Sequence, residues 1–331
     1  MTPTPRIVSG MRPTGPLHLG HYFGVLKQWI ALQASHQCYF FVADWHALTS
    51  EYHDPLRIRG FVPELVMDWV AAGLDPARCI IFQQSMVAEH VELHLVLSMI
   101  TPTSWLERNP TYKDQLQQLA EKDLTTYGFL GYPVLQAADI LLYKPQAVPV
   151  GQDQLPHLEL TREIARRFNF LYGETFPEPQ ALLTPAAKCP GLDGRKMSKS
   201  YGNSIYLRED FVGVRSKVMQ MLTDANRKRK TDPGDPDICN LFPYHVLMTS
   251  PEDQATIREA CVKAEIGCVD CKKKLIESME AFLIPLHDRR RKLVERPDEA
   301  WDILEQGSVR AREEARRTQD EVRRRINFLG R

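Results

Sequence analysis

Two lysines and two serines lie together in the pentapeptide Lys-Met-Ser-Lys-Ser at residues 196–200. Glycines bracket this stretch at Gly191, Gly194 and Gly202. A lysine ammonium group is a point charge that suits phosphate. Two of them, three positions apart on a glycine-bracketed segment, predict a mobile loop that closes over a phosphate group.

A second candidate phosphate site lies far upstream, in the sequence Pro-Leu-His-Leu-Gly-His at residues 16–21. His18 and His21 are three positions apart at the expected start of a helix, which puts both imidazoles on one face. The free N–H groups of a helix N-terminus favour anions, and Gly20 lets a nucleotide approach the backbone. The alternative interpretation is two surface histidines beside a helix cap.

Strand and helix patterns alternate in the part of the chain that must position these groups. Apolar runs predict strands at 6–9, 38–43 and 79–82, and helical spacing predicts helices at 20–34 and 55–73. This alternation predicts a Rossmann-like, doubly wound parallel sheet of the α/β class. Such sheets bind ligands at the carboxyl ends of their strands, and the loop at 10–21 follows the first strand.

The pattern of apolar residues changes after Gly202, because no continuous apolar run typical of a buried strand follows it. Helical patterns then cover 208–222, 252–264, 270–295 and 298–328. We therefore predict a Rossmann-like domain over 1–203 and an all-helical domain over 204–297. The last helix, in 298–331, is expected to pack back on the first domain.

Composition is ordinary for a globular protein, with 43% hydrophobic and 25% charged residues and no net charge. Basic clusters at 227–230, 272–274, 289–292 and 323–325 suit a surface that follows nucleic-acid phosphates, although solvated helix faces explain any one of them as well. The chain shows no signal peptide and no membrane-length apolar run, so a cytoplasmic location is expected.

Four of the seven cysteines fall in one short window at Cys239, Cys261, Cys268 and Cys271. The last two form a Cys-x-x-Cys pair after Gly267. Four thiolates suit tetrahedral zinc or an iron–sulfur cluster, and spacing alone does not choose between them or exclude chance clustering. The odd total argues against a disulfide framework.

The pentapeptide and the upstream histidine motif, in this order, resemble the paired signatures of class I aminoacyl-tRNA synthetases. Stretches at 43–49, 131–143 and 148–162 narrow the resemblance to tryptophanyl-tRNA synthetases, and it covers essentially the whole chain. It implies ATP-dependent activation of tryptophan, with Mg²⁺, and transfer to tRNA(Trp). It also implies a homodimer in which each tRNA spans both subunits, and a helical domain that reads the anticodon region.

The resemblance carries over site residues by position. It implies catalytic roles for His18, His21, Lys196 and Lys199. The implied ATP-binding residues are Met11, Arg12, Pro13, Thr14, Gly20, His21, Gly151, Gln152, Asp153, Lys196, Met197, Ser198, Lys199 and Ser200. The implied tryptophan-binding residues are His46, Tyr132, Gln136, Asp139, Val148, Val150 and Gln154.

Asp139 stands out because it lies on an otherwise apolar helix, where a carboxylate needs a partner. The resemblance implies that it accepts a hydrogen bond from the indole N–H of tryptophan, whereas a salt bridge to an arginine is the structural alternative. Arg12, Gln136 and Gln152 depart from the residues usual in the family, which are Gln, Met and an acidic residue.

A subset of similar synthetases carries a four-iron, four-sulfur cluster on nearly the cysteine spacing found here. The resemblance therefore implies a [4Fe–4S] cluster on Cys239, Cys261, Cys268 and Cys271, with zinc as the alternative. Two rival functions remain, a tyrosyl-tRNA synthetase and a non-catalytic relative that binds tryptophan or tRNA. The runs at 137–143 and 150–154 argue against the first, and the intact histidines and lysines argue against the second.

Overall fold

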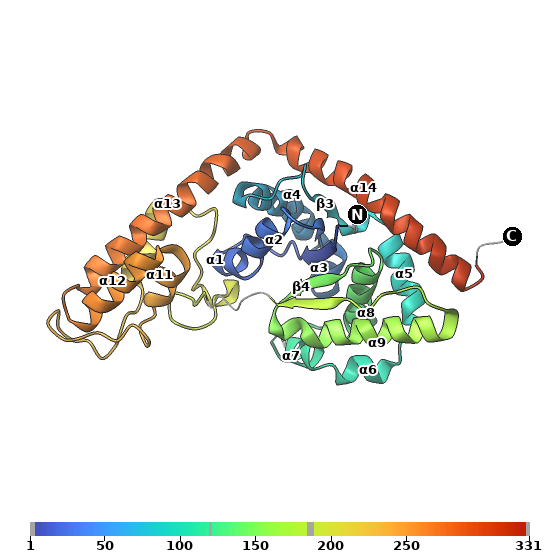
Figure 1. Cartoon of the computed structure of the whole chain (residues 1–331), viewed down its shortest axis with the longest axis horizontal. Coiled ribbons are helices and arrows are strands. Elements are labelled where there is room, and N and C mark those ends of the chain that lie inside the picture. The colour runs from blue at the N-terminus through green and yellow to red at the C-terminus, as the bar shows by residue number, and fades with distance from the viewer. Residues whose placement is uncertain (1–3, 119–120, 184–188, 329–331) are drawn as a thin grey trace. The chain divides into compact units, whose positions relative to one another are not determined.

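The computed structural model describes residues 4–118, 121–183 and 189–328, and its contacts divide the chain into two compact units (Figure 1). The first unit comprises Met1–Gly15, Trp29–Thr184 and Arg296–Arg331. The second comprises Pro16–Gln28 and Pro185–Glu295. The contacts thus group the histidine motif and the pentapeptide with the helical part of the chain, which differs from a division at residue 203.

The first unit is built on a sheet of five parallel strands in the order β3-β2-β1-β4-β5. These strands are β1 Arg6–Met11, β2 Gln37–Val42, β3 Ile80–Gln83, β4 Ala147–Val150 and β5 Gln180–Leu183. Chain order runs outward in opposite directions from β1 and β4, so their carboxyl ends form the switch point at which such sheets bind ligands. The predicted doubly wound α/β class is confirmed.

Both faces of this sheet are covered, which explains why β2 is apolar along almost its whole length. Phe40 stacks on Trp29, with ring centroids 4.4 Å apart, and Trp29 meets Trp69 of helix α4 (Pro55–Ala72) edge to face. The neighbouring Tyr39 and Phe41 point to the opposite face, because side chains alternate along a strand. Tyr39 packs there on Tyr143, just after helix α8 (Tyr127–Leu141), with ring centroids 4.7 Å apart.

The helices of the first unit connect and cover the strands. They are α2 Lys27–Leu32, which begins in the second unit, then α3 Asp44–Glu51, α4 Pro55–Ala72, α5 Glu89–Ser98, α6 Thr103–Arg108, α7 Pro110–Gln118, α8 Tyr127–Leu141, α9 Leu155–Tyr172 and α14 Pro297–Arg325. Helix α4 begins and ends as its sequence predicts. Asp54 accepts a hydrogen bond from the Arg57 N–H, and Gly73 ends the helix with a positive φ of 124°.

The second unit is helical, as predicted for this part of the chain. Its helices are α1 Leu19–His21, α10 Phe211–Gln220, α11 Phe242–Met248, α12 Pro251–Val262 and α13 Cys268–Val294. Buried residues on α13, among them Leu275, Met279 and Leu283, form the face against which α10 and α11 pack. No helix in the described part of either unit is long and apolar enough to cross a membrane.

The helix predicted over 20–34 is present as an unbroken helical stretch from Leu19 to Leu32, but its first half is not a regular α-helix. Leu19–His21 is followed by a π-helical segment at Tyr22–Leu26, and the α-helix resumes at Lys27. The Lys27 N–H donates to the Tyr22 carbonyl, five residues back, which marks the wider turn. Such bulges often occur at functional sites, and this one directly follows His21.

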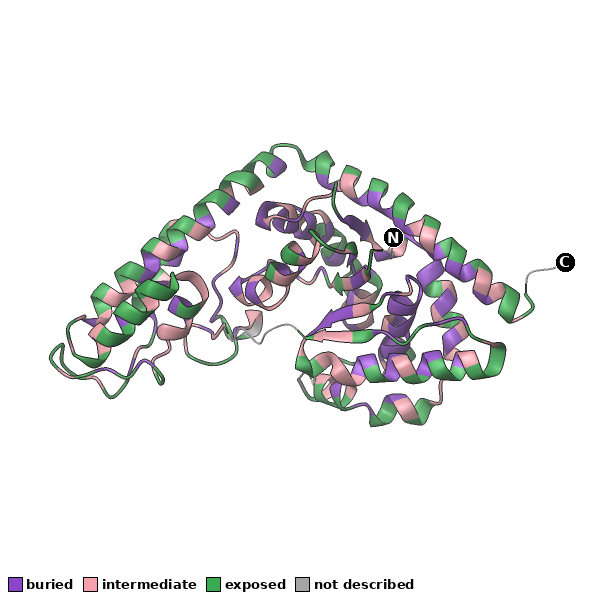
Figure 2. Ribbon diagram, viewed as in Figure 1, coloured by how far each residue is buried: buried purple, intermediate pink, exposed green. Residues whose placement is uncertain are grey.

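The long helix α14 lies against β3, α4 and α5, with its inward face buried and its outer face exposed (Figure 2). Glycine permits the closest approach, because a Cβ atom on Gly307 would lie 1.7 Å from the carbonyl oxygen of Ile81. Ion pairs add to this contact, as Arg312 reaches Glu89 at 3.0 Å and Arg323 reaches Glu92 at 2.6 Å. The basic cluster at 323–325 therefore has a structural role in part.

We expect Gly307→Ala to destabilise the first unit, since the new methyl group would overlap backbone that cannot move freely. Overpacking of this kind costs about 1–3 kcal/mol or more in the free energy of unfolding. The matched control is Gly60→Ala on α4, where a Cβ meets nothing within 4 Å. That change should stabilise by up to about 1 kcal/mol. Urea denaturation measures both, and equal stabilities for the two variants would contradict the packing argument.

Candidate active site

A buried carboxylate organises the polar residues near the carboxyl ends of β2 and β3. Asp139, on α8, is 1% exposed. Its Oδ2 lies 2.7 Å from His46 Nε2, and its Oδ1 accepts from Gln84 Nε2 at 2.7 Å and lies 2.6 Å from His90 Nδ1. Its hydrogen-bond partners are two histidines and a glutamine, rather than the arginine of the structural alternative.

The partners of Asp139 keep it ionised. Burial alone would raise the pKa of this carboxyl, but the charge and hydrogen bond of His46 and the hydrogen bond of His90 lower the pKa to about 2. His90 is fixed in turn, since its Nε2 lies 2.8 Å from the hydroxyl of Tyr143. The Asp139 side chain is therefore a carboxylate at neutral pH.

Tyr132, Gln136 and Asp139 lie at positions i, i+4 and i+7 of α8 and so share one face of the helix. The Tyr132 hydroxyl lies 3.0 Å from His157 Nε2, and His157 Nδ1 lies 3.2 Å from the side-chain nitrogen of Asn109. Burial raises the pKa of Tyr132 above the range in which a phenol ionises in water. Gln136 is half-buried.

The other tryptophan-binding candidates lie along β4 and the turn that follows it. Val148 and Val150 are buried and pack in one apolar cluster with Ile140 of α8 and Leu158 of α9. Gln154 is half-buried, and its side-chain nitrogen donates to the Asp153 carboxylate at 3.0 Å.

Several ATP-binding candidates lie at the carboxyl ends of β1 and β4. Arg12 follows β1, is exposed, and donates to Ser50 Oγ at 3.4 Å. After β4, Gln152 and Asp153 are exposed in a short 3-10 turn that begins after Gly151. A Cβ on Gly151 would lie 2.6 Å from a carboxylate oxygen of Asp153, so glycine permits this turn.

The structure brings the two predicted phosphate motifs together within the second unit. The Leu19 N–H donates to the Ile205 carbonyl at 3.0 Å, and the Leu207 N–H donates to the Leu17 carbonyl at 2.8 Å. His18 lies opposite Tyr206 in this short antiparallel pairing. The histidine motif is thereby held beside the segment that follows the pentapeptide.

The two histidines are neutral at pH 7. Burial, followed by the charge of Lys199, lowers the pKa of His18 to about 4. Burial also takes the pKa of His21 well below its ordinary value, with smaller contributions from His18 and Lys199. His21 Nδ1 accepts from the His18 N–H at 3.1 Å, whereas His18 Nδ1 is buried without a hydrogen-bond partner among the described residues.

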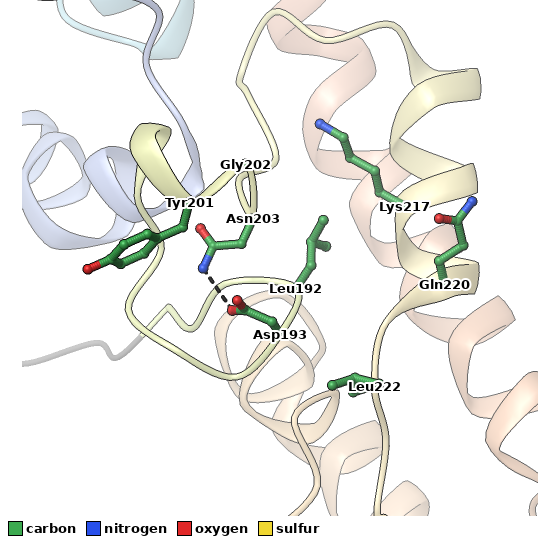
Figure 3. A pocket seen from close by; sticks show the side chains of 8 residues that line it. All are labelled: Leu192, Asp193, Tyr201, Gly202, Asn203, Lys217, Gln220 and Leu222. Carbon is green, nitrogen blue, oxygen red and sulfur yellow. Dashed lines mark hydrogen bonds between the residues drawn. The ribbon is translucent and has the colours of Figure 1, made fainter.

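The pentapeptide contains a turn of 3-10 helix, Lys199–Tyr201, which begins after Ser198 and ends at Gly202 with a φ of 63°. Lys196 is exposed, Met197 is buried, and Ser198 and Lys199 are half-buried. A pocket of about 300 Å³ lies beside this segment within the second unit (Figure 3). Tyr201, Asn203 and Lys217 are among its lining residues.

The four cysteines of the predicted metal site all belong to the second unit, and their thiols are near enough to affect one another's pKa. Burial, followed by the nearby thiols of Cys239, Cys261 and Cys268, raises the pKa of Cys271 to about 12. His245 Nε2 lies 3.3 Å from Cys271 Sγ. Within residues 4–118, 121–183 and 189–328, however, no group of three or more His, Cys, Asp or Glu side chains is arranged to hold a metal ion.

Sequence reasoning missed the residues that support these groups, chiefly Gln84, His90, Asn109 and Asn203. Gln84 directly follows β3, so its place at the carboxyl end of a strand was a usable signal. His90 on α5 and Asn109 before α7 carry no comparable signal, because their partners lie far away in the sequence.

We compared the chain with protein-family models and with curated proteins, and the matches fall in one enzyme family. A family model described as tRNA synthetases class I (W and Y) matches residues 2–284. The chain is 51% identical to the tryptophan–tRNA ligase of Thermotoga maritima, over 98% of this chain and 99% of that protein. It is 45% identical to the tryptophan–tRNA ligase of Aquifex aeolicus, over 98% of this chain and all of that protein.

A solved structure is similar over nearly the same span. The tryptophanyl-tRNA synthetase from Campylobacter jejuni, complexed with ADP and tryptophan, superposes with a TM-score of 0.88 at 33% identity and covers 97% of this chain and 99% of that one. The fold and these matches define a class I tRNA synthetase, which is a ligase. Within that class, the chain belongs to the tryptophan–tRNA ligase family.

The buried neutral histidines predict how stability depends on pH. The pKa of His157 is lowered to about 4, by burial first and then by the charge of His46, and His18 behaves similarly. In the unfolded chain a histidine has a pKa near 6.5 and is protonated below that pH, whereas the folded side chain stays neutral down to about pH 4. The unfolded state therefore binds the extra proton, and the free energy of unfolding falls as pH drops from about 6.5 to about 4. Each such group contributes up to about 1.4 kcal/mol per pH unit in that window.

Urea unfolding across this pH range checks the expectation with two variants. His157→Gln should give a shallower fall in unfolding free energy than the unmodified protein. His53→Gln, at an exposed position, is the matched control and should follow the unmodified protein. Parallel curves for all three proteins would contradict the role given to His157.

Proposed function

We propose that this chain activates tryptophan with ATP and transfers the activated amino acid to tRNA(Trp). One observation supports this most directly. The pairing of Leu17 and Leu19 with Ile205 and Leu207 holds two neutral histidines beside a lysine-rich segment within one compact unit. Uncharged N–H donors next to ammonium groups suit a polyphosphate whose charge grows during reaction.

Formation of the tryptophanyl adenylate requires positioned substrates and stabilisation of negative charge, and it requires no nucleophile from the protein. The tryptophan carboxylate attacks the α-phosphorus of ATP, the bond to the bridging oxygen breaks, and pyrophosphate departs with its electron pair. Negative charge then builds on the phosphoryl oxygens and on pyrophosphate. Lys196 and Lys199 neutralise that charge, while His18 and His21 orient the phosphates as hydrogen-bond donors. Next, a terminal ribose hydroxyl of the tRNA attacks the tryptophanyl carbonyl carbon, and AMP leaves.

Asp139 selects the amino acid in this proposal. A carboxylate has about four acceptor positions, and His46, Gln84 and His90 use three of them. The remaining position accepts the indole N–H of tryptophan. A hydrogen bond to a charged acceptor contributes about 1.5–3 kcal/mol. Tyr132, Gln136, Val148, Val150 and Gln154 complete the amino-acid site.

The remaining candidates bind ATP. Residues 11–14, with Gly20, bring backbone and the Arg12 guanidinium to the nucleotide, and residues 151–153 meet the ribose. In the second unit, residues 196–200 meet the phosphates. Mg²⁺ arrives with ATP, because this ion keeps most of its water and binds through substrate phosphates.

We expect Lys199→Ala and Lys196→Ala each to lower the rate of tryptophan-dependent ATP–pyrophosphate exchange by about 10²–10³-fold, the usual effect of losing one preorganised donor at such a site. Tryptophan affinity, measured by calorimetry, should stay nearly unchanged, since neither lysine contacts the amino acid in this proposal. Lys228→Ala, at an exposed position away from the pentapeptide, is the matched control. Unaltered exchange in both lysine variants would overturn the assignment.

The helices of the second unit that follow the pentapeptide are assigned to the tRNA. Its basic clusters at 227–230, 272–274 and 289–292 contain exposed side chains, among them Lys228, Lys273 and Lys292, that can follow phosphates. In this assignment residues 204–297 recognise the anticodon region, and residues 1–203 carry out catalysis with α14 packed on the sheet. A cytoplasmic location follows, because the tRNA substrate is there.

A homodimer is part of the proposal. Val91 and Leu95 of α5 and Met99, which directly follows it, lie at i, i+4 and i+8 and leave 42%, 54% and 72% of their surface exposed. An apolar stripe of this kind suits a self-complementary contact between two copies. Sedimentation equilibrium should give twice the chain mass, and a Leu95→Asp variant should give the monomer. A monomer for the unmodified protein would refute the dimer.

We also propose a [4Fe–4S] cluster on Cys239, Cys261, Cys268 and Cys271. All four cysteines lie in the second unit, where their thiols affect one another's pKa, and Arg227 Nη1, 4.0 Å from Cys268 Sγ, can offset thiolate charge. Zinc needs four sulfurs about 2.3 Å from one ion. A cluster binds each thiolate to a different iron atom, so its ligands can stand farther apart.

Metal analysis tests the cluster directly. Anaerobically purified protein should be brown and contain about four iron and four sulfide per chain. Cys268→Ser should lose both, whereas Cys189→Ser, outside the quartet, should keep them. Stoichiometric zinc without sulfide would overturn the cluster and leave the proposed synthetase activity untouched.

A further inference from the structure

The pentapeptide belongs to a folded hairpin within the second unit. Pro190 pairs with Lys196 in an antiparallel bridge, and the Gly191 N–H donates to the Arg195 carbonyl at 2.6 Å. The turn between them uses Gly194, whose φ of 82° lies in the left-handed region that favours glycine. This backbone holds the first arm of the hairpin, but by itself it does not fix the lysines.

Asn203 ties the two arms together. Its side-chain oxygen accepts from the Ser198 N–H at 2.9 Å. Its side-chain nitrogen donates to Asp193 Oδ1 at 2.8 Å and to the Lys196 carbonyl at 3.2 Å (Figure 3 shows the contact with Asp193). The Asn203 carbonyl also accepts from the Leu192 N–H at 2.9 Å. The residue is 4% exposed, so these bonds are shielded from water.

Only an amide of this length can make all three side-chain contacts. A carboxylate would have no donor and would face both the Asp193 carboxylate and the Lys196 carbonyl. The surroundings are shaped for this amide, because a Cβ on Gly191 would lie 2.1 Å from the Asn203 side-chain nitrogen. Gly191 therefore leaves the space that the Asn203 side chain occupies.

We propose that Asn203 is a positioning residue for adenylate formation, acting through the backbone of Lys196 and Ser198. This inference rests on the proposed function. Asn203 binds the carbonyl of one residue and the N–H of the other, so it sets where the Lys196 side chain leaves the backbone and where the turn carrying Lys199 begins. It does not contact substrate.

The test combines exchange kinetics, tryptophan binding and limited trypsin digestion of the full chain. Asn203→Asp keeps the shape of the side chain but removes its donor. We expect its maximal rate of ATP–pyrophosphate exchange to fall about 10²-fold, as for other small displacements of catalytic groups. Its affinity for tryptophan should be unchanged, and trypsin should cut faster after Arg195 and Lys196.

Two further variants separate positioning from general damage. Gly191→Ala pushes on the same amide and should reproduce the kinetic and proteolytic changes, which keeps the inference testable if Asn203→Asp folds poorly. Gln220→Ala is the control, since Gln220 lines the same pocket but is exposed and bonds to Ser216 within its own helix. It should behave like the unmodified protein.

The outcomes are distinguishable. A full exchange rate in folded Asn203→Asp, or an equal loss of tryptophan affinity and exchange, would overturn the positioning role. If the unmodified protein shows no tryptophan-dependent exchange, the proposed function fails instead. The trypsin comparison still decides in that case whether Asn203 holds the hairpin, and uniform cleavage rates in all variants would show that it does not.

Discussion

The buried carboxylate of Asp139 is the constraint on which the first unit depends. An ionised group in an apolar interior is costly unless hydrogen bonds replace the lost water. Here the replacements come from α3, from the turn after β3 and from α5, through His46, Gln84 and His90. The strand ends and helices must therefore keep their relative positions for the charge to remain stable. The site proposed for the indole N–H is thus built by contacts that also join these elements of the fold.

In the second unit, the ammonium groups of Lys196 and Lys199 must be positioned although neither side chain is fully buried. Lys196 is exposed and Lys199 half-buried, so water and salt weaken any interaction that could fix their side chains. The structure instead fixes the backbone from which they leave, through Asn203 on one side and the pairing of residues 17–19 with 205–207 on the other. The neutral imidazoles of His18, which is buried, and His21, which is half-buried, add donors there without adding repulsion.

Much of the fold was predictable because its signals are local. Continuous apolar runs marked β2 and β3 since both faces of the sheet are covered, and Asp54 with Gly73 marked the ends of α4. The π-helical turn was not predictable, because helical spacing is nearly the same for both kinds of turn. The partners of Asp139 lie 49 to 93 residues away, so no local pattern shows that they contact it. The sequence therefore indicated the candidate residue Asp139, but only the tertiary contacts show which side chains bind its carboxylate.

The most direct test of this account measures ATP–pyrophosphate exchange driven by tryptophan and by tyrosine, in the unmodified protein and in Asp139→Asn. The account predicts exchange with tryptophan and essentially none with tyrosine. It also predicts that kcat/KM for tryptophan falls by about 10–150-fold in the variant, the equivalent of one hydrogen bond to a charged acceptor. Exchange driven equally by tyrosine, or an unchanged kcat/KM for tryptophan in folded Asp139→Asn, would contradict it.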